Sequence, residues 1–281
     1  MATVSGPRKL AFTNQSGGAG KSTSTINVGA VCASFGLRTL IVDLDAQCDA
    51  SVALGYEYRD GLEDQATIFE VLEGDAKMAD AIVPAYAGPQ EDENSKVIDN
   101  LHLVLGSDDM EAAEQILKDM TLREMWLRRA LKSIEGDFDV VLIDTPGNLG
   151  LVVVNAIVAS EEVIACVMPS YKELRALTRM EQKVQLLEDE FAEFGGGAKL
   201  TGVLILGVPT TRNQGAVWDD GRQLAQETYG DLVLPTVRRS PRIPEAYAAG
   251  SPLLQFDRAG EATSDYVKVT KALGFQRAKR R

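Results

Sequence analysis

The chain has 281 residues, a length that accommodates one large α/β domain or two small ones. Hydrophobic residues make up 45% and charged residues 25%, which excludes wholesale disorder and a fibrous repeat. Acidic residues outnumber basic ones and give a net charge of −12, a balance that by itself argues against nucleic acid or an anionic membrane as a partner.

Cysteine and histidine are too few and too scattered for a zinc site or for nucleophilic catalysis. The three cysteines, Cys32, Cys48 and Cys166, show no Cys-x-x-Cys spacing. The single histidine, His102, lies in an alternating apolar stretch that is typical of a strand, so we do not expect it to act as a base. The pattern of a secretory signal is lacking, and no apolar run approaches the ~20 residues of a spanning helix, which predicts a cytoplasmic protein with reduced thiols.

Short apolar runs recur along the chain and predict the buried strands of a mostly parallel sheet. Helical patterns lie between most of them. One begins at Lys21 and ends at Gly36, and in another the apolar residues advance by three or four from Leu174 to Phe194. We therefore expect an α/β fold, a single domain over residues 1–281 with helices on both faces of a twisted sheet. Strands are predicted at residues 10–13, 39–42, 101–105, 140–143, 163–168 and 203–208.

Charge is distributed unevenly along the chain. Residues 57–124 contain 18 acidic and 5 basic residues, whereas residues 236–281 contain 10 basic and 4 acidic ones and end in a basic tail over 276–281. Within the acidic part, residues 85–100 combine Pro, Gly and acidic residues without periodicity, which predicts a loop insertion. The local balance therefore bears more directly on partners than the net charge does.

A glycine-rich turn between the first predicted strand and helix has the features of a phosphate-binding loop. Its sequence is SGGAGKST over residues 16–23. Small residues let backbone N–H groups surround a phosphate chain, and the following helix adds its N-terminal dipole. Lys21 supplies a cation toward the β- and γ-phosphates and Ser22 a hydroxyl for Mg²⁺. The usual pattern GxxxxGK[ST] has glycine where this chain has Gln15, and the alternative is a turn that only caps a helix.

Three aspartates follow two of the predicted strands. Asp43 and Asp45 belong to the sequence VDLDAQ at 42–47, and Asp144 follows the apolar run at 140–143. Ligands of open α/β sheets bind beyond the carboxyl ends of the strands, and an aspartate after an apolar strand is typical of a Walker B carboxylate. An aspartate often only begins a turn, but these elements in this order favour a nucleotide site.

With these motifs the sequence resembles the ParA family of partition ATPases, which includes the Soj type and the related MinD proteins. The family's loop, KGGxGK[ST][ST], is often preceded by Asn-Gln, and here by Asn14 and Gln15. Further segments are similar to other family motifs, so the resemblance covers nearly the whole chain. These segments are residues 42–47, 138–146, 168–171 with the residues that follow them, and 237–246. It implies a P-loop NTPase fold and hydrolysis of ATP with Mg²⁺ as cofactor.

The resemblance also implies roles for single residues. Lys21 binds the β- and γ-phosphates, and Thr23 contacts the α-phosphate. Ser22 and Asp144 serve Mg²⁺ with support from Asp43, while Asp45 orients the attacking water. The implied catalytic residues are Lys21, Asp45 and Asp43, the nucleotide-binding residues are Gly17, Gly18, Ala19, Gly20, Lys21, Ser22 and Thr23, and the metal residues are Ser22, Asp144 and Asp43.

Ser16 is the main departure from the family pattern. That position holds the signature lysine, which reaches across an ATP-sandwiched dimer to the partner's phosphates in the manner of an arginine finger. Such a finger contributes ~10³–10⁵ in rate, so Ser16 predicts slow hydrolysis or replacement by Lys172, Arg175 or Arg212. A second departure is Gly147, where the family commonly has proline, which predicts a more flexible segment after Asp144.

The implied partners are a second copy of the chain, nonspecific double-stranded DNA and a ParB-like centromere-binding protein. Arg238, Arg239 and Arg242 lie in the matching C-terminal segment and are expected to contact DNA phosphates without reading bases. A solvated basic face without a partner is the alternative. An amphipathic pattern from Tyr266 to Leu273 would suit a MinD-like membrane helix, but a closing helix packed on the core fits it better, so we expect no membrane partner.

We therefore predict a DNA-segregation ATPase of plasmids or chromosomes, cytoplasmic and on the nucleoid when ATP is bound. ATP drives dimerisation and DNA binding, and a ParB-like protein stimulates hydrolysis to ADP and phosphate. Two alternatives stay open. One is an ATP-gated binding module with little hydrolysis, which Ser16 favours, and the other is a MinD-like or cargo-positioning ATPase with the same chemistry and a different partner.

Overall fold

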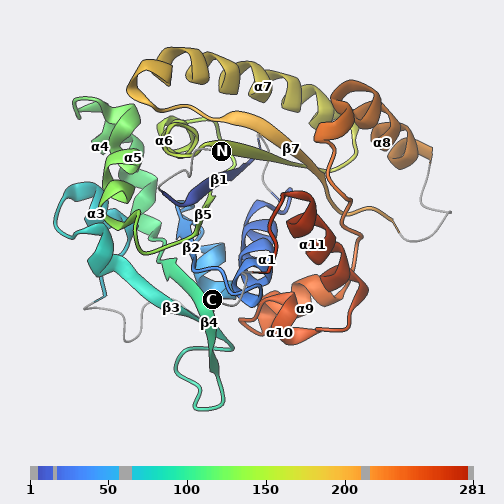
Figure 1. Ribbon diagram of the computed structural model, residues 1–281, viewed down its shortest axis with the longest axis horizontal. Coiled ribbons are helices and arrows are strands. Elements are labelled where there is room, and N and C mark those ends of the chain that lie inside the picture. Colours follow the sequence, from blue (N-terminus) through green and yellow to red (C-terminus); the bar gives the residue numbers. More distant parts are fainter. Residues whose placement is uncertain (1–5, 15–17, 57–64, 210–215, 278–281) are drawn as a thin grey trace.

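One seven-stranded sheet organises the chain, as the computed structural model shows for residues 6–14, 18–56, 65–209 and 216–277 (Figure 1). The strand order is β3-β4-β2-β5-β1-β6-β7, and neighbouring strands run parallel except for β3, which is antiparallel to β4. The strands are β1 (Arg8–Thr13), β2 (Thr39–Asp43), β3 (Ile82–Ala87), β4 (Lys96–Val104), β5 (Val140–Asp144), β6 (Glu162–Val167) and β7 (Lys199–Ile205). The expected α/β fold with a mostly parallel sheet is confirmed.

The β3–β4 hairpin corrects the loop insertion expected at residues 85–100. β3 and β4 occupy both ends of that segment, and only residues 88–95 connect them. Pro89 and most of the acidic residues that suggested a loop lie in that connection. Pro84 lies in β3 itself, which tolerates a proline because it is an edge strand. The hairpin projects from the sheet at the bottom of Figure 1.

Alternate residues of the central strands face two different sets of helices. In β1, Leu10 and Phe12 pack on one side of the sheet and Ala11 packs on the other, as the pleat of a strand requires. The first side is covered mainly by the long helix that follows β1 and by the C-terminal helices, which lie next to it in Figure 1. These helices are α1 (Lys21–Ser34), α2 (Asp49–Ala53), α9 (Arg242–Ala248), α10 (Leu253–Phe256) and α11 (Glu261–Ala272).

The other side of the sheet is covered by helices from the middle of the chain. Most of the apolar stripe predicted from Leu174 onward is buried along the longest of them, whereas Phe194 is 63% exposed because the chain has already left the helix before Gly195. The glycine adopts a φ of 66°, which ends the helical turn. These helices are α3 (Ile68–Glu73), α4 (Ala113–Lys118), α5 (Trp126–Leu131), α6 (Leu151–Ala159), α7 (Tyr171–Phe191) and α8 (Ala216–Tyr229).

The C-terminal helix α11 packs on the core, as its amphipathic pattern suggested. Tyr266, Val269 and Leu273 are buried against α1 and the sheet, so they offer no apolar face to a membrane. Arg8 of β1 fastens the end of this helix, because its guanidinium donates to the carbonyl of Leu273 and lies 4.3 Å from the ring centroid of Phe275. Among the described helices, none combines the length and apolar character needed to cross a bilayer.

Candidate active site

Three motifs that are far apart in the sequence meet at the carboxyl ends of β1, β2 and β5. β5 lies between β1 and β2, and the sheet register sets Asp43 of β2 directly opposite Asp144 of β5. Asp144 is also level with Phe12 of β1, just before the glycine-rich turn. Both carboxylates are fully buried. The parallel sheet therefore assembles the site that the sequence predicted in separate pieces.

The glycine-rich turn leaves room for an anion at the start of α1. Gly18 and Gly20 adopt φ angles of 74° and 79°, and apart from the residues next to it in the chain no described residue has an atom within 4 Å of where a Cβ of Gly18 would be. Gly20 is the residue that precedes α1, and it has no side chain that could accept hydrogen bonds from the first N–H groups of the helix. Lys21 is buried in the first turn. Ser16 and Gly17 lie outside the described residues.

Asp144 has one satisfied and one orphaned oxygen. Its Oδ1 accepts a hydrogen bond of 3.4 Å from the Thr25 hydroxyl, whereas its buried Oδ2 has no partner among the described residues. Burial and the neighbouring Asp43 raise the pKa of Asp144 well above its ordinary value, and a hydrogen bond from Ser22 and the charge of Lys21 oppose that rise. A buried, unpartnered carboxylate oxygen beside a serine hydroxyl fits a hard cation such as Mg²⁺, which prefers oxygen ligands.

Asp43 is held by residues that the sequence did not single out. Its Oδ2 accepts from the Ser51 backbone N–H at 2.9 Å and from the Ser51 hydroxyl at 2.7 Å, while its Oδ1 accepts from the Asp45 N–H at 3.2 Å. Gly106 lies so close that a Cβ there would be 2.9 Å from the carboxyl carbon of Asp43. No local pattern pointed to Ser51 or Gly106, because only the folded sheet brings them to Asp43.

Asp45 lies in the loop between β2 and α2. Its side chain is half-buried, and its Oδ1 accepts a 3.1 Å hydrogen bond from the N–H of Gln47, which forms a turn of the Asx type. Cys48, three residues after Asp45, precedes α2 with a φ of 54°. This left-handed conformation costs energy for any residue other than glycine. The loop thus holds Asp45 close to Asp43 in a backbone arrangement that is locally strained.

His102 and two of the three cysteines lie in packed surroundings. His102 is a strand residue of β4 that packs edge-to-face on Phe138 at a centroid distance of 5.6 Å, and burial lowers its pKa. Burial also raises the pKa of Cys32 and of Cys166 to about 12, which keeps both as thiols.

Two of the cations named as substitutes for a lysine at position 16 reach the same edge of the sheet. Lys172 and Arg175 are exposed in the first turns of α7, which follows β6, the neighbour of β1. The Asn14 side chain at the end of β1 donates to the Cys166 carbonyl and to the Glu173 carboxylate, so β1 is tied to the start of α7. Arg212 lies outside the described residues.

The three arginines expected to contact DNA differ in their surroundings. Arg238 donates to Asp265 at 2.6 Å and to Glu261 at 2.5 Å, and Arg242 pairs with Glu245 at 2.6 Å and with Asp257 at 3.2 Å. Arg239 is exposed and has no ion pair with any described residue.

Sequence comparison identifies relatives along almost the whole chain. A family described as an AAA domain matches residues 7–194. The chain is 29% identical over 263 residues to the sporulation initiation inhibitor protein Soj of Bacillus subtilis, covering 93% of this chain and 96% of that protein. It is 28% identical over 267 residues to the chromosome partitioning protein ParA of Myxococcus xanthus, with 95% and 87% coverage. It is 30% identical over 268 residues to the chromosome partitioning protein ParA of Caulobacter vibrioides, with 94% and 92% coverage.

Solved structures share the fold. A McdA–ATP complex from Cyanothece superposes with a TM-score of 0.79 at 20% identity, covering 98% of this chain and 99% of that one. Cobyrinic acid a,c-diamide synthase from Mycobacterium smegmatis with bound ADP and magnesium gives a TM-score of 0.74 at 27% identity, with 95% and 94% coverage. These structural relatives bind ATP or ADP, the latter with magnesium. Together with the buried aspartate pair and the lysine-bearing loop, the matches show that the chain belongs to the ParA/Soj family of P-loop ATPases.

Proposed function

We propose that the protein is a DNA-partition ATPase. ATP binding joins two copies of the chain, the dimer binds DNA without sequence preference, and a ParB-like partner stimulates hydrolysis to ADP and phosphate. The observation that carries the proposal is the meeting of Lys21, Asp144 and Asp43 at one edge of the sheet, beside the loop of Asp45. Relatives named as partitioning proteins support the assignment to DNA.

Phosphoryl transfer depends on positioning and on charge neutralisation, and the residues of this site divide these tasks. Backbone N–H groups of Gly17, Gly18, Ala19 and Gly20 surround the phosphates, Lys21 neutralises the β- and γ-phosphates, and Thr23 contacts the α-phosphate. Ser22 and Asp144 hold Mg²⁺, which when bound offsets the charge that develops on the transferred phosphoryl group.

Asp43 ends β2, and Asp45 lies in the loop that follows it. Both oxygens of Asp43 already accept hydrogen bonds from Ser51 and Asp45, which supports a role in holding the loop and not in direct metal ligation. Asp45 orients the attacking water. Ser16 supplies no cation to a partner's phosphates, so hydrolysis is slow unless Lys172, Arg175 or Arg212 takes that role.

DNA contacts fall mainly on Arg239, with Arg238 and Arg242 contributing when their carboxylate partners are displaced. The ion pairs of those two arginines support this ranking, because a paired guanidinium has less to gain from a phosphate. In this proposal the protein is cytoplasmic and lies on the nucleoid in its ATP-bound state.

Phosphate release from ATP, measured with and without DNA and a ParB-type partner, tests the enzymatic part. We expect slow release that DNA and the partner accelerate together, and none in the matched Asp45→Ala variant. If the wild-type protein releases no more phosphate than Asp45→Ala under any condition, the enzymatic proposal is wrong. ATP-dependent dimerisation and DNA binding in that case would establish the second candidate, an ATP-gated binding module, which the serine at position 16 favours.

A further inference from the structure

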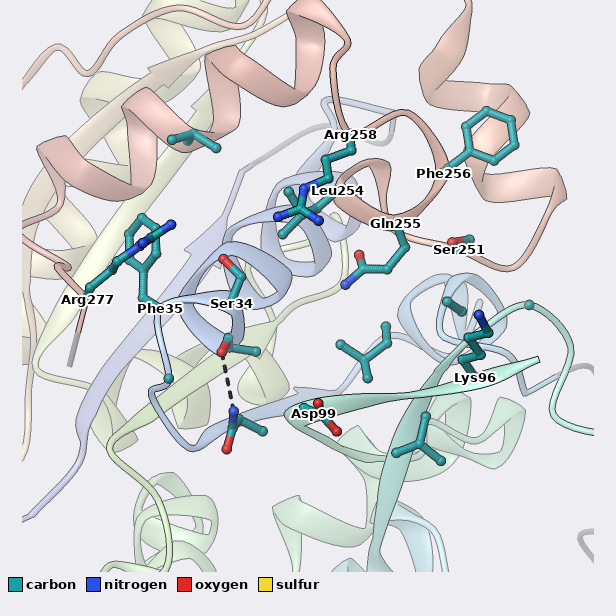
Figure 2. A pocket seen from close by; sticks show the side chains of 18 of the residues that line it. Ser34, Phe35, Lys96, Asp99, Ser251, Leu254, Gln255, Phe256, Arg258 and Arg277 are labelled. Atoms are coloured by element: carbon teal, nitrogen blue, oxygen red, sulfur yellow. Dashed lines mark hydrogen bonds between the residues drawn. The ribbon is translucent and has the colours of Figure 1, made fainter. Parts of the chain in front are cut away.

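A large groove lies at the end of α1 opposite to Lys21. It has a volume of about 1390 Å³, and its walls are the C-terminal end of α1, the first half of β4, and the segments around α10 and α11 (Figure 2). α1 has 14 residues, so at 1.5 Å per residue the groove is about 20 Å from the nucleotide site. None of its lining residues belongs to the active site described above.

The groove is positively charged along its length. Four cations line it against the single carboxylate of Asp99, and within the described residues none of the four forms an ion pair. Figure 2 shows Arg277 at one end, Lys96 at the other and Arg258 between them. Spread charge of this kind suits an elongated anion better than a compact one. The four cations are Lys96, Arg258, Lys271 and Arg277.

One wall of the groove is a strand without a neighbour on that side. β2 begins opposite Leu101 of β4, so residues 96–99 of β4 have no strand next to them there among the described residues. β3 occupies their other side, where it pairs with Lys96 and Val97. Asn100, at a φ of 63°, ends this stretch and donates to the Ala33 carbonyl at 3.5 Å. Free backbone N–H and C=O groups on a strand edge are satisfied best by another polypeptide in extended form.

The floor of the groove is apolar. Ile98 is buried in the core below it, and Phe35 and Leu254 pack against the same core as partly buried side chains. A strand laid along β4 alternates its side chains between the floor and the rim, because the side-chain period of a strand is two residues. Its apolar side chains would contact Ile98 and its acidic ones would reach the four cations.

We propose that this groove binds an extended acidic segment of a partner protein, one that alternates acidic and apolar residues and adds a strand to β4. Duplex DNA fits less well, because it has no polypeptide backbone with which to extend the sheet along residues 96–99 of β4. The inference goes beyond the proposed partition function, since neither the nucleotide nor the arginines around residue 238 takes part.

The test measures, by fluorescence anisotropy, how tightly a peptide binds to the nucleotide-free protein. The probe is a fluorescein-labelled ten-residue peptide of alternating Glu and Val. We expect the double variant Lys96→Glu/Arg258→Glu to weaken binding about tenfold, since each exposed ion pair contributes modestly and reversal also adds repulsion. The matched control Lys118→Glu/Arg129→Glu changes two exposed cations outside the groove and should leave the affinity unchanged. Equal losses in both variants would overturn the proposal.

Two further arms separate strand pairing from simple attraction. The same peptide N-methylated at alternate residues cannot donate along one edge, and we expect it to bind about tenfold more weakly; undiminished binding would refute strand addition to β4. A 20-base-pair DNA duplex is the competitor in the second arm. Displacement of the peptide by the duplex at equal charge concentration would show a phosphate-binding surface and reject the peptide, whereas retention of the peptide supports it. Because no nucleotide is present, failure here leaves the ATPase proposal unaffected.

Discussion

Asp43 and Asp144 face each other across β2 and β5, and both side chains are fully buried. Burial raises the pKa of Asp43 to about 7 in spite of the hydrogen bonds from Ser51, and burial with repulsion from Asp43 raises that of Asp144. Two like groups in this setting are unfavourable when both are charged, and a cation bound at Asp144 would offset their repulsion. The site is therefore arranged for its ligand at the expense of the stability of the empty protein.

This arrangement makes the empty protein less stable as the pH rises. Above about pH 4 the unfolded chain has released its aspartate protons while the folded Asp43 still holds one, so the free energy of unfolding falls up to about pH 7. We expect Asp43→Asn to raise that free energy at pH 8 by about 1–3 kcal/mol without nucleotide and metal, by removing the cost of a buried charge. Thermal melts of the wild type and of Asp43→Asn at pH 5 and pH 8 in EDTA measure this change in stability. Asp137→Asn, at an exposed position, is the control, and a lower melting temperature for Asp43→Asn at pH 8 would contradict the argument.

Ser16 gives a second prediction at the scale of one residue. Ser16→Lys restores the cation that the family places at the partner's phosphates, so the basal rate of ATP hydrolysis should rise at least about tenfold. Steady-state phosphate release by the wild type, Ser16→Lys and the control Ser16→Ala measures this. If Ser16→Lys binds ATP but is no faster, another cation already fills the role.

At the scale of elements, α7 shows how an amphipathic pattern translates into packing. Leu177 points into the core at 2% exposure, whereas Leu186 of the same helix is 48% exposed. Truncation of a buried leucine removes apolar contacts and leaves a cavity, while truncation of an exposed one does neither. Burial also distinguishes α11 from a membrane-facing helix, because its apolar residues Tyr266 and Val269 are fully buried, whereas a membrane-facing helix exposes such residues.

The two leucines form a matched pair for measurement. We expect Leu177→Ala to lower the free energy of unfolding by about 2–5 kcal/mol and Leu186→Ala to change it by less than about 0.5 kcal/mol. Urea titration followed by circular dichroism gives both values. Similar losses in the two variants would mean that the exposed face of α7 is covered in solution.

At the scale of the whole molecule, the net charge of −12 conceals a division. The acidic surplus belongs to residues 57–124, and the basic surplus follows residue 236. The four acidic residues of that basic part are the ones that pair with its arginines: Asp265 and Glu261 with Arg238, and Glu245 and Asp257 with Arg242. The fold thus neutralises two of the three expected DNA contacts and leaves Arg239 exposed.

Arg238 and Arg239 should therefore respond differently to alanine. Burial acts to raise the pKa of Asp265, but hydrogen bonds from Arg238 hold it below its ordinary value. Arg238→Ala leaves this buried carboxylate with Lys268, at 3.3 Å, as its remaining ion-pair partner among the described residues, and should lower the melting temperature by several degrees. Arg239→Ala should leave stability unchanged and weaken DNA binding, with the logarithmic salt slope reduced by about one per copy of the chain. Thermal melts and salt-dependent DNA titrations test both. Unchanged DNA affinity in Arg239→Ala at low salt would exclude this surface.

Much of the fold was predictable because its signals are local. Apolar runs marked six of the seven strands, and the glycine-rich turn before Lys21 marked the start of α1. β3 was missed because Pro84 interrupts its apolar run, and only an edge strand tolerates such a proline.

The sequence by itself determined where six of the seven strands lie and where the glycine-rich turn and the aspartates fall at strand ends, since these features depend on neighbouring residues and on side-chain chemistry. Tertiary structure decided which residues surround those carboxylates and which charges remain free. Ser51 and Gly106 reach Asp43, and Asp265 reaches Arg238, only after the sheet and α11 have packed. Such contacts join distant parts of the chain, and their existence depends on the strand order and helix packing that no local pattern encodes.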